Sequence, residues 1–253
     1  MQNISILGCG WLGFPLAEAL VAKGYSVKGS TTTVAKLTAL ESANISPYLI
    51  HSDNDSIPSE FLNSDILIIL ITSKDIDAFK RLIAQIETSS IQSVIYISST
   101  SVYPNSNSVV TEESPTNDSP LAQIENLFRH NTSFQSTIIR FGGLFGYHRK
   151  PGNFIRSHNT IPNPEGFINL IHQDDCIGIL LAIIEQNIWN ETFNACADSH
   201  PKRADFYIKE MAKVDRLHPI LDPESENTYK IISPKKLISV LHYTFKYSNL
   251  MEY

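Results

Sequence analysis

Three glycines in one short loop are the residues near the start of the chain that point most clearly to chemistry. Gly8, Gly10 and Gly13 follow a β-branched run and open a helical segment. In that context the first glycine permits a tight turn, the second leaves room for a pyrophosphate and the third lets helix and strand approach closely. The free N–H groups at the helix start would then face the phosphates. The spacing predicts a dinucleotide site that includes Trp11 and Leu12, with a ligand-free glycine turn as the alternative.

The end of the next predicted strand bears on which dinucleotide would bind. NAD sites usually carry an Asp or Glu there for the ribose 2′-hydroxyl, but this sequence has Thr31, flanked by Ser30 and Thr32. Hydroxyl groups together with the nearby Lys36 could instead hold a 2′-phosphate. We therefore expect NADP as the cofactor, with NAD as the alternative. A Ser/Thr helix N-cap would explain at least one of these hydroxyls without any ligand.

Three more polar residues directly follow later β-branched runs. Thr72 and Ser98 complete the predicted cofactor-binding set. Ser99 comes next and could bind a substrate carbonyl or hydroxyl group. A serine at a strand end can equally well satisfy backbone groups, so this structural role stays open.

Further along, three side chains could give or take a proton. Tyr103 comes soon after the serines just described, whereas Tyr147 and His148 follow a later run. His148, together with Arg149 and Lys150, could bind an anionic substrate or act as a base. Packing at a cleft edge would also explain Tyr103, and a solvated loop would explain the other four residues. No group of His, Cys, Asp and Glu has the spacing of a metal site, so no metal is expected.

Short apolar runs alternate with helical segments over the first 145 residues or so. The run over 65–71 is apolar without alternation, as in a strand buried on both faces. This alternation predicts an α/β fold with a Rossmann-type, doubly wound parallel sheet. The predicted strands are Ile4–Leu7, Ser26–Gly29, Tyr48–His51, Asp65–Ile71, Ser93–Ile97 and Ser136–Phe141, and the predicted helices are Phe14–Lys23, Val34–Ser42, Asp75–Glu87 and Ala122–His130.

The pattern loosens beyond about residue 142, where prolines and glycines mark loops. We expect residues 1–145 to form the dinucleotide-binding core and residues 146–253 mainly a small α+β substrate cap packed on it as one structural unit. Helices are predicted at Asp174–Glu185 and Arg203–Val214, and extended segments at Phe167–Leu170 and Thr228–Ile232.

Composition excludes several classes of protein. The 253 residues carry a formal net charge of −6 without a block of Lys and Arg, so nucleic-acid binding is not expected. No apolar run approaches the roughly 20 residues that span a membrane, and no signal peptide is visible. The three cysteines lack CxxC spacing and are odd in number, which is typical of reduced thiols. We therefore expect a cytoplasmic protein that acts on a small molecule.

Four further segments follow the glycine loop in a characteristic order. The set resembles the extended short-chain dehydrogenases/reductases, the NAD-dependent epimerase/dehydratase family, over residues 4–185. The resemblance implies NAD(P) binding, a small-molecule substrate, homodimer formation, and a role for Ser99 in bonding the oxygen that undergoes hydride transfer. It also implies a structural turn at His172, rather than a catalytic dyad with Asp174 or Asp175. The matching segments are Tyr96–Tyr103, Thr111–Pro115, Arg140–Gly146 and Ile171–Asp175.

The sequence departs from this family where a Tyr-x-x-x-Lys helix would supply the acid. No Tyr lies between Tyr103 and Tyr147, no Lys lies between Lys80 and Lys150, and Leu121 stands at the expected tyrosine position. A leucine cannot donate a proton, so the standard chemistry is not expected. Two classes of function follow: an oxidoreductase or epimerase with a non-standard acid/base, or a non-catalytic protein that binds or senses NAD(P).

Overall fold

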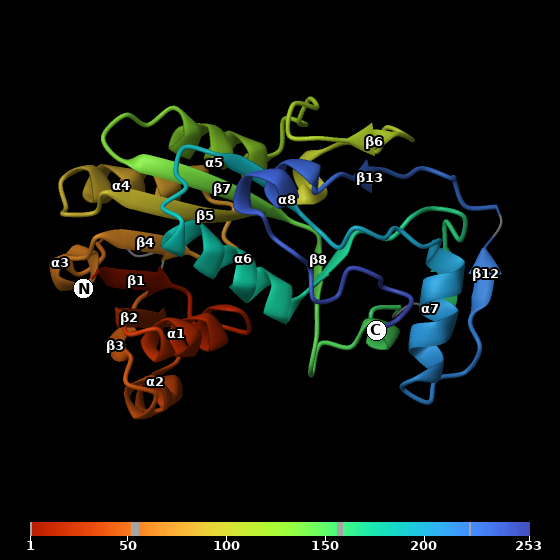
Figure 1. The fold of residues 1–253 in the computed structure, drawn as a ribbon, viewed down its shortest axis with the longest axis horizontal. Helices are drawn as coiled ribbons and strands as arrows, with labels where there is room; N and C mark the ends of the chain where they lie inside the picture. The colour runs from red at the N-terminus through yellow and green to blue at the C-terminus, as the bar shows by residue number, and fades with distance from the viewer. Residues whose placement is uncertain (1, 52–55, 156–158, 223) are drawn as a thin grey trace. The chain divides into compact units, whose positions relative to one another are not determined.

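The computed structural model describes residues 2–51, 56–155, 159–222 and 224–253, which belong to two compact units (Figure 1). Unit 1 consists of Met1–Ser98, Asp118–Ile139 and Leu180–Thr192. Unit 2 consists of Ser99–Asn117, Arg140–Ile179 and Phe193–Tyr253. The chain therefore passes between the units several times, and four elements (β5, β7, α6 and β11) contribute residues to both.

A seven-stranded sheet organises unit 1, with the strand order β11-β7-β5-β4-β1-β2-β3. The pairs of β1 with β2 and β4, of β2 with β3 and of β4 with β5 are parallel, which confirms the predicted Rossmann-type fold. The order reverses beside β1, so the loops after β1 and β4 diverge at the edge where such sheets bind ligands. The strands are β1 (Asn3–Leu7), β2 (Ser26–Thr31), β3 (Ser46–Leu49), β4 (Ile66–Ile69), β5 (Ser93–Ser99), β7 (Gln135–Phe141) and β11 (Thr192–Ala195).

Local signals account for where the helices begin. Asp75 caps α4 by accepting the N–H groups of Asp77 and Ala78, each at 3.0 Å. Ser119 caps α5, and Pro120 occupies the first turn, where its missing N–H costs nothing. The helices are α1 (Gly13–Ala22), α2 (Leu37–Ser42), α3 (Ser59–Leu62), α4 (Ile76–Glu87), α5 (Pro120–Arg129) and α6 (Gln173–Glu185), and a short 3-10 turn (Val34–Lys36) precedes α2.

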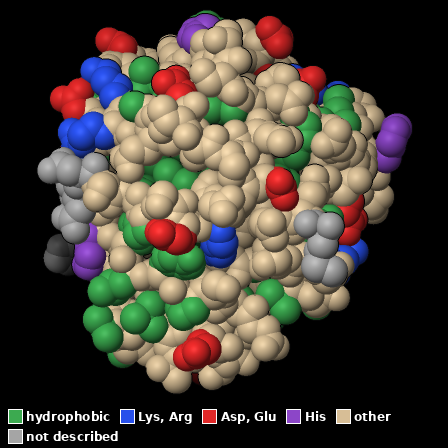
Figure 2. Space-filling model, turned by 90° about the vertical axis from the view of Figure 1, so that its left-hand side faces the viewer, with side chains coloured by type: hydrophobic (Ala, Val, Ile, Leu, Met, Phe, Trp, Pro, Cys, Tyr) green, Lys and Arg blue, Asp and Glu red, His purple; other side chains and the backbone are tan. Residues whose placement is uncertain are grey.

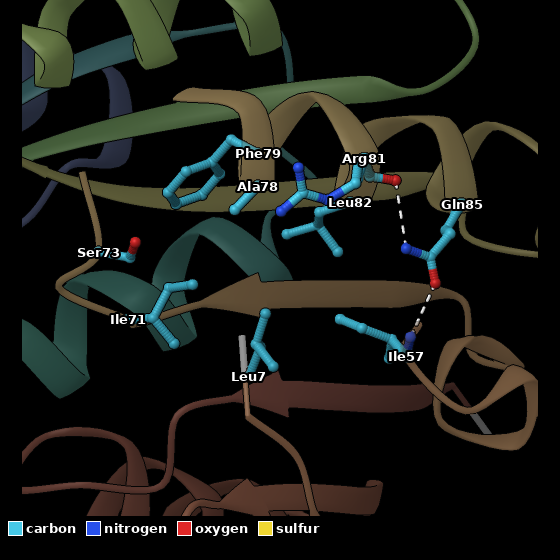
Figure 3. Close-up of a pocket in the computed structure, with 9 residues that line it drawn as sticks. All are labelled: Leu7, Ile57, Ile71, Ser73, Ala78, Phe79, Arg81, Leu82 and Gln85. Atoms are coloured by element: carbon cyan, nitrogen blue, oxygen red, sulfur yellow. Dashed lines mark hydrogen bonds between the residues drawn. The ribbon is translucent and has the colours of Figure 1, made fainter. Parts of the chain in front are cut away.

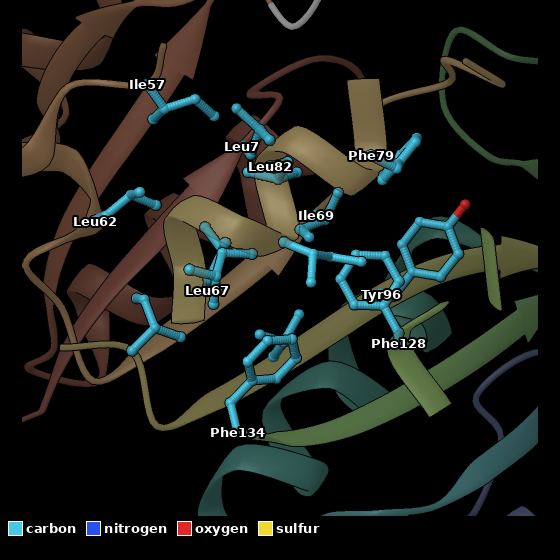
Figure 4. Packing of buried hydrophobic residues seen from close by; sticks show 14 of the residues in the cluster. Leu7, Ile57, Leu62, Leu67, Ile69, Phe79, Leu82, Tyr96, Phe128 and Phe134 are labelled. Atoms are coloured by element: carbon cyan, nitrogen blue, oxygen red, sulfur yellow. The ribbon is translucent and has the colours of Figure 1, made fainter. Parts of the chain in front are cut away.

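The core of unit 1 lies between the sheet and helices α4 and α5 (Figure 4). Phe79 from α4, Tyr96 from β5 and Phe128 from α5 form one aromatic group, with ring centroids 4.7–6.0 Å apart. All four residues of β4 are buried, as predicted for this strand. This packing holds the carboxyl ends of β4 and β5 in fixed positions.

Among its described residues, unit 2 has three two-stranded parallel sheets, which pair β8 with β10, β9 with β12 and β6 with β13. A second apolar cluster, which includes Phe145, Ile161 and Phe206, forms its core. The elements of this unit are β6 (Val109–Val110), β8 (Gly143–Phe145), β9 (Thr160–Pro162), β10 (Leu170–His172), β12 (Ile220–Asp222), β13 (Ile231–Ile232), α7 (Arg203–Ala212) and α8 (Lys235–Leu241), with 3-10 turns at Thr100–Val102 and Pro151–Asn153.

Several short elements differ from the sequence prediction. The extended segment expected at 167–170 is a strand only from Leu170 onward, and strand β11 was not predicted at all. The four residues of β11 include the polar Asn194, which is fully buried, so the run lacks the apolar signal of an interior strand. Within the described ranges, no helix is both long enough and apolar enough to cross a membrane.

Surface charge on the face drawn in Figure 2 is scattered. Acidic and basic side chains are dispersed among apolar and other side chains there, and the Lys and Arg side chains visible on this face form no broad patch.

Candidate functional site

The three positions of the loop after β1 are glycine for different structural reasons. Gly8 has φ +107°, a conformation that side chains rarely adopt, and a Cβ on Gly13 would lie 2.2 Å from the carbonyl oxygen of Gly8. Both glycines are therefore required by the fold itself. A Cβ on Gly10 would meet nothing within 4 Å and would project into open space in front of the loop. That space fits a pyrophosphate, because a side chain at Gly10 would fill it.

Ser30, at the end of β2, fastens the glycine loop to the sheet. The Gly8 N–H donates to Ser30 Oγ at 2.9 Å, and the Cys9 N–H donates to the Ser30 carbonyl at 2.7 Å. Ser30 is buried, so its side chain shapes the loop from beneath. The neighbouring Cys9 is also buried, which raises the pKa of its thiol to about 12 and leaves it neutral.

Thr31, Thr32 and Lys36 are the other residues that were predicted to bind the cofactor near its ribose. Strand β2 ends at Thr31, whose Oγ1 accepts the Thr33 N–H at 3.1 Å and so shapes the turn before α2. Thr32 and Lys36 are exposed, and the first turn of α1 holds no acidic side chain. A phosphate group in this region would therefore meet hydroxyl groups and an accessible cation.

An apolar hollow opens beside the ends of β1 and β4 (Figure 3). Leu7, the residue before Gly8, and Ile71 form its floor, and side chains of α4 face them from above. Gln85 closes one end, because its Oε1 accepts the Ile57 N–H at 2.8 Å. Sequence reasoning missed this hollow. Thr72, which was predicted to bind the cofactor, is exposed between the lining residues Ile71 and Ser73. The lining residues are Leu7, Ile57, Ile71, Ser73, Ala78, Phe79, Arg81, Leu82 and Gln85.

Helix α5 presents an unexpected carboxylate to the end of β5. Glu125 is 1% exposed, and Ser98 Oγ donates to its Oε1 at 2.5 Å. Arg129 contacts the other carboxylate oxygen at 3.4 Å. Leu121, one helical turn earlier, packs against the apolar core. The hydroxyl of Ser98 is thus directed toward α5, and a single sequence gave no signal for this contact.

Ser99 is the last residue of β5. Its Oγ accepts the Ser101 N–H at 3.1 Å and starts the following 3-10 turn. A hydroxyl that accepts one hydrogen bond still has its own hydrogen to donate. Ser99 therefore combines the predicted backbone role with a capacity to bond a substrate oxygen.

The contacts of Tyr103 agree with the packing role that the sequence left open beside the role of an acid. The ring is buried, and the hydroxyl donates to Asn194 Oδ1 at 2.8 Å and accepts a hydrogen bond from Arg140 Nη1. Asn194 is anchored in turn, since its N–H donates to Glu112 Oε1 at 2.7 Å. Burial raises the pKa of Tyr103 in spite of the nearby Arg140. A phenol held in this way is not available to a substrate.

Tyr147 and His148 lie in a tight exposed turn of unit 2. Tyr147 has φ +48°, is 58% exposed, and donates through its hydroxyl to Asp174 Oδ1 at 2.7 Å. This hydrogen bond raises the pKa of the phenol. His148 is exposed beside it, whereas Arg149 is used by the fold, because its Nε donates to the Leu144 carbonyl at 2.7 Å. Tyr147 therefore keeps an accessible phenol next to a carboxylate.

His172 forms a buried turn and is not part of a charged dyad. Its Nδ1 accepts the Asp174 N–H at 3.1 Å, and burial lowers the pKa of the imidazole. Asp175 is occupied by the N–H groups of Lys246 and Tyr247, at 2.7 and 3.1 Å. The neutral ring thus serves as a backbone acceptor. Among the residues that the structure describes, no group of His, Cys, Asp and Glu could hold a metal ion.

The sequence of the chain matches a protein family and a bacterial protein. Residues 3–119 match the family described as the NAD binding domain of 6-phosphogluconate dehydrogenase. Protein YeeZ of Escherichia coli K12 is 30% identical to the chain over 271 aligned positions, which cover 98% of this chain and 97% of YeeZ.

Solved structures share the fold over nearly the whole chain. UDP-glucuronic acid 4-epimerase from Bacillus cereus, in complex with UDP-glucuronic acid and NAD, superposes with a TM-score of 0.80 at 19% identity, over 99% of this chain and 96% of the epimerase. A putative NAD-dependent epimerase/dehydratase from Methylobacillus flagellatus gives a TM-score of 0.81 at 19% identity, over 99% and 95% of the two chains. The chain belongs to the family of E. coli YeeZ, and it shares its Rossmann fold with solved structures of NAD-dependent epimerases/dehydratases.

Proposed function

We propose that the glycine loop of unit 1 binds NAD(P), with NADP preferred over NAD. The observation that carries the proposal is Gly10, which the fold alone does not require to be glycine. Trp11 and Leu12 lie between Gly10 and the start of α1, where the free N–H groups of a helix start favour a phosphate. NAD in the Bacillus cereus relative supports a dinucleotide of this kind. The preference for a 2′-phosphate rests on Thr31 and the exposed Lys36.

Other residues complete the proposed cofactor site. The apolar hollow lies beside the glycine loop, and we propose that its apolar floor forms part of the surface against which the dinucleotide packs. Thr72 and Ser98 border the site at the ends of β4 and β5. We keep residues 1–145 as the proposed nucleotide-binding core and residues 146–253 as the proposed substrate cap.

We further propose an oxidoreductase or epimerase activity on an anionic small molecule, with an acid/base that is not standard for the family. A bound nicotinamide would supply hydride transfer. Ser99 would orient the reacting oxygen through its free hydroxyl hydrogen. Tyr147, whose accessible hydroxyl is oriented by a hydrogen bond to Asp174 at 2.7 Å, would replace the tyrosine that α5 lacks, and the exposed His148 is the alternative base.

A second candidate is a non-catalytic protein that binds or senses NAD(P). The observation that favours it is helix α5, where the partly buried Leu121 packs against the core and Glu125 is a buried acid. Neither side chain can act as an activated phenol. In this second candidate function, the cofactor site binds NAD(P) and the protein transfers no hydride.

Two measurements separate these candidates. Calorimetric titration of NADPH and NADH into the protein tests the cofactor site, and absence of heat with both would overturn the whole proposal. Absorbance of the reduced nicotinamide, followed while UDP-glucuronic acid or UDP-glucose is added, tests turnover. An activity that Ser99→Ala and Tyr147→Phe both abolish supports the enzyme. Tight NADPH binding without turnover of any substrate supports the sensor.

A further inference from the structure

Lys230 occupies an unusual position in unit 2. It directly precedes strand β13 and is half-buried, and its Nζ donates to the carbonyl oxygen of Tyr103 at 2.5 Å. Its own carbonyl accepts Asn169 Nδ2 at 2.9 Å. The adjacent Tyr229 is fixed as well, because its N–H donates to Asn107 Oδ1 at 2.8 Å. The backbone therefore carries the amine to a defined place beside Tyr103.

No carboxylate balances the charge of this amine. Within the described part of the chain, no Asp or Glu forms an ion pair with Lys230, and burial alone lowers its pKa. The exposed Lys23, Lys202 and Lys246 each contact a carboxylate at 2.7–3.2 Å. A partly buried cation without an anionic partner is unfavourable for folding, and such groups are typical of ligand sites.

The partner of Lys230 belongs to a rigid segment that starts at Ser99. The Tyr103 N–H donates to the Thr100 carbonyl at 3.2 Å, and the Asn117 N–H donates to the Val102 carbonyl at 2.7 Å. The ring of Tyr103 is buried and its hydroxyl is hydrogen-bonded, as described above. A 3-10 turn over Thr100–Val102 joins Ser99 to Tyr103. The amine of Lys230 is thus bonded to the same short segment that carries the proposed ligand of the reacting oxygen.

We propose that Lys230 is a substrate-binding cation of the active site, where its ammonium bonds a carboxylate or phosphate oxygen of a substrate whose reacting oxygen lies at Ser99. This inference rests on the proposed function and names the charge of its substrate class. Only one of the three ammonium hydrogens is needed for Tyr103, so the others can reach an anion. Lys230 would then be the residue that selects anionic over neutral substrates.

Lysine-selective labelling tests the contact directly. Pyridoxal 5′-phosphate condenses with an amine to an imine and releases water, and borohydride then reduces the imine, so peptide mapping reports each lysine separately. Glucuronate, glucose 1-phosphate and neutral glucose are added as competitors. We expect the two anions to slow labelling of Lys230 about tenfold, glucose to have no effect, and the exposed Lys235 to serve as an unprotected internal control. The two anionic arms distinguish carboxylate from phosphate recognition.

Three variants separate charge from structure. Lys230→Gln keeps a donor for the Tyr103 carbonyl but loses the charge, and it should bind glucuronate or glucose 1-phosphate about tenfold more weakly with an unchanged melting temperature. Lys230→Arg should restore binding, and Lys230→Met should lose both binding and some stability. Unprotected labelling, a Lys230 that the reagent does not reach, or a Gln variant with wild-type anion affinity would each overturn the inference. NADPH binding, measured in the same samples, fails only if the proposed cofactor site is wrong.

Discussion

Alanine substitutions at two positions of the glycine loop should distinguish a glycine that the fold requires from a glycine that only a bound ligand requires. In Gly13→Ala the new Cβ would lie 2.2 Å from the Gly8 carbonyl oxygen and 3.2 Å from Leu70 Cδ1. The oxygen cannot retreat easily, because the Gly8 N–H is bonded to the buried Ser30. Overpacking typically costs about 1–3 kcal/mol, and a clash with backbone belongs at the upper end. Alanine regains up to about 1 kcal/mol of helix propensity, so we expect a net loss of about 2 kcal/mol.

Gly10→Ala is the matched control for that substitution. Its Cβ meets nothing within 4 Å, and Gly10 is not among the residues with positive φ. We expect its free energy of unfolding to stay within about 0.5 kcal/mol of wild type. Urea unfolding followed by circular dichroism gives both values, and about 2 kcal/mol corresponds to roughly 4–8 °C in melting temperature for a chain of this size. Equal stability of the two variants would refute the distinction between the glycines.

Three further outcomes follow from the contacts of single side chains. Tyr103→Phe removes a hydroxyl that the buried Arg140 bonds, so urea unfolding should show a loss of about 1–3 kcal/mol, and an unchanged midpoint would argue against the structural role. Lys36→Gln should weaken NADPH binding about tenfold in calorimetry and leave NADH binding unaltered, whereas equal or tighter wild-type binding of NADH would contradict the NADP preference. Burial lowers the pKa values of His172 and His200 below 6.5, so the unfolded chain takes up protons first as pH falls. The free energy of unfolding should therefore decrease as the pH falls through about 6.5, and less steeply in His172→Gln; identical slopes would show that His172 is not the titrating group.

Local patterns predicted the parts of the site that a few consecutive residues determine. The glycine spacing after β1 predicted the loop, because the tight turn at Gly8 and the helix start at Gly13 are only five residues apart. The apolar run of β4 likewise gave a strand buried on both faces. Neither feature depends on distant partners, so one sequence was sufficient for both.

Roles that depend on distant partners could not be predicted. Tyr103 bonds Asn194, 91 residues away, and its carbonyl accepts from Lys230, 127 residues away. No periodicity or motif connects such positions. The same tyrosine therefore looked like a possible acid in the sequence, whereas its contacts bury it in unit 2. Ser98 and Glu125 form a similar long-range contact that only the packing of α5 on β5 reveals.

Fluorescence of Trp11 offers the most direct test of the dinucleotide site. The chain has two tryptophans, so Trp189→Phe leaves only the one that stands inside the glycine loop. A reduced nicotinamide dinucleotide bound at this loop should quench Trp11 emission saturably at one site per chain, and Gly10→Leu should abolish the effect while the protein stays folded. Quenching that persists undiminished in Gly10→Leu, or none in the parent variant, would contradict the claim that this loop binds NAD(P).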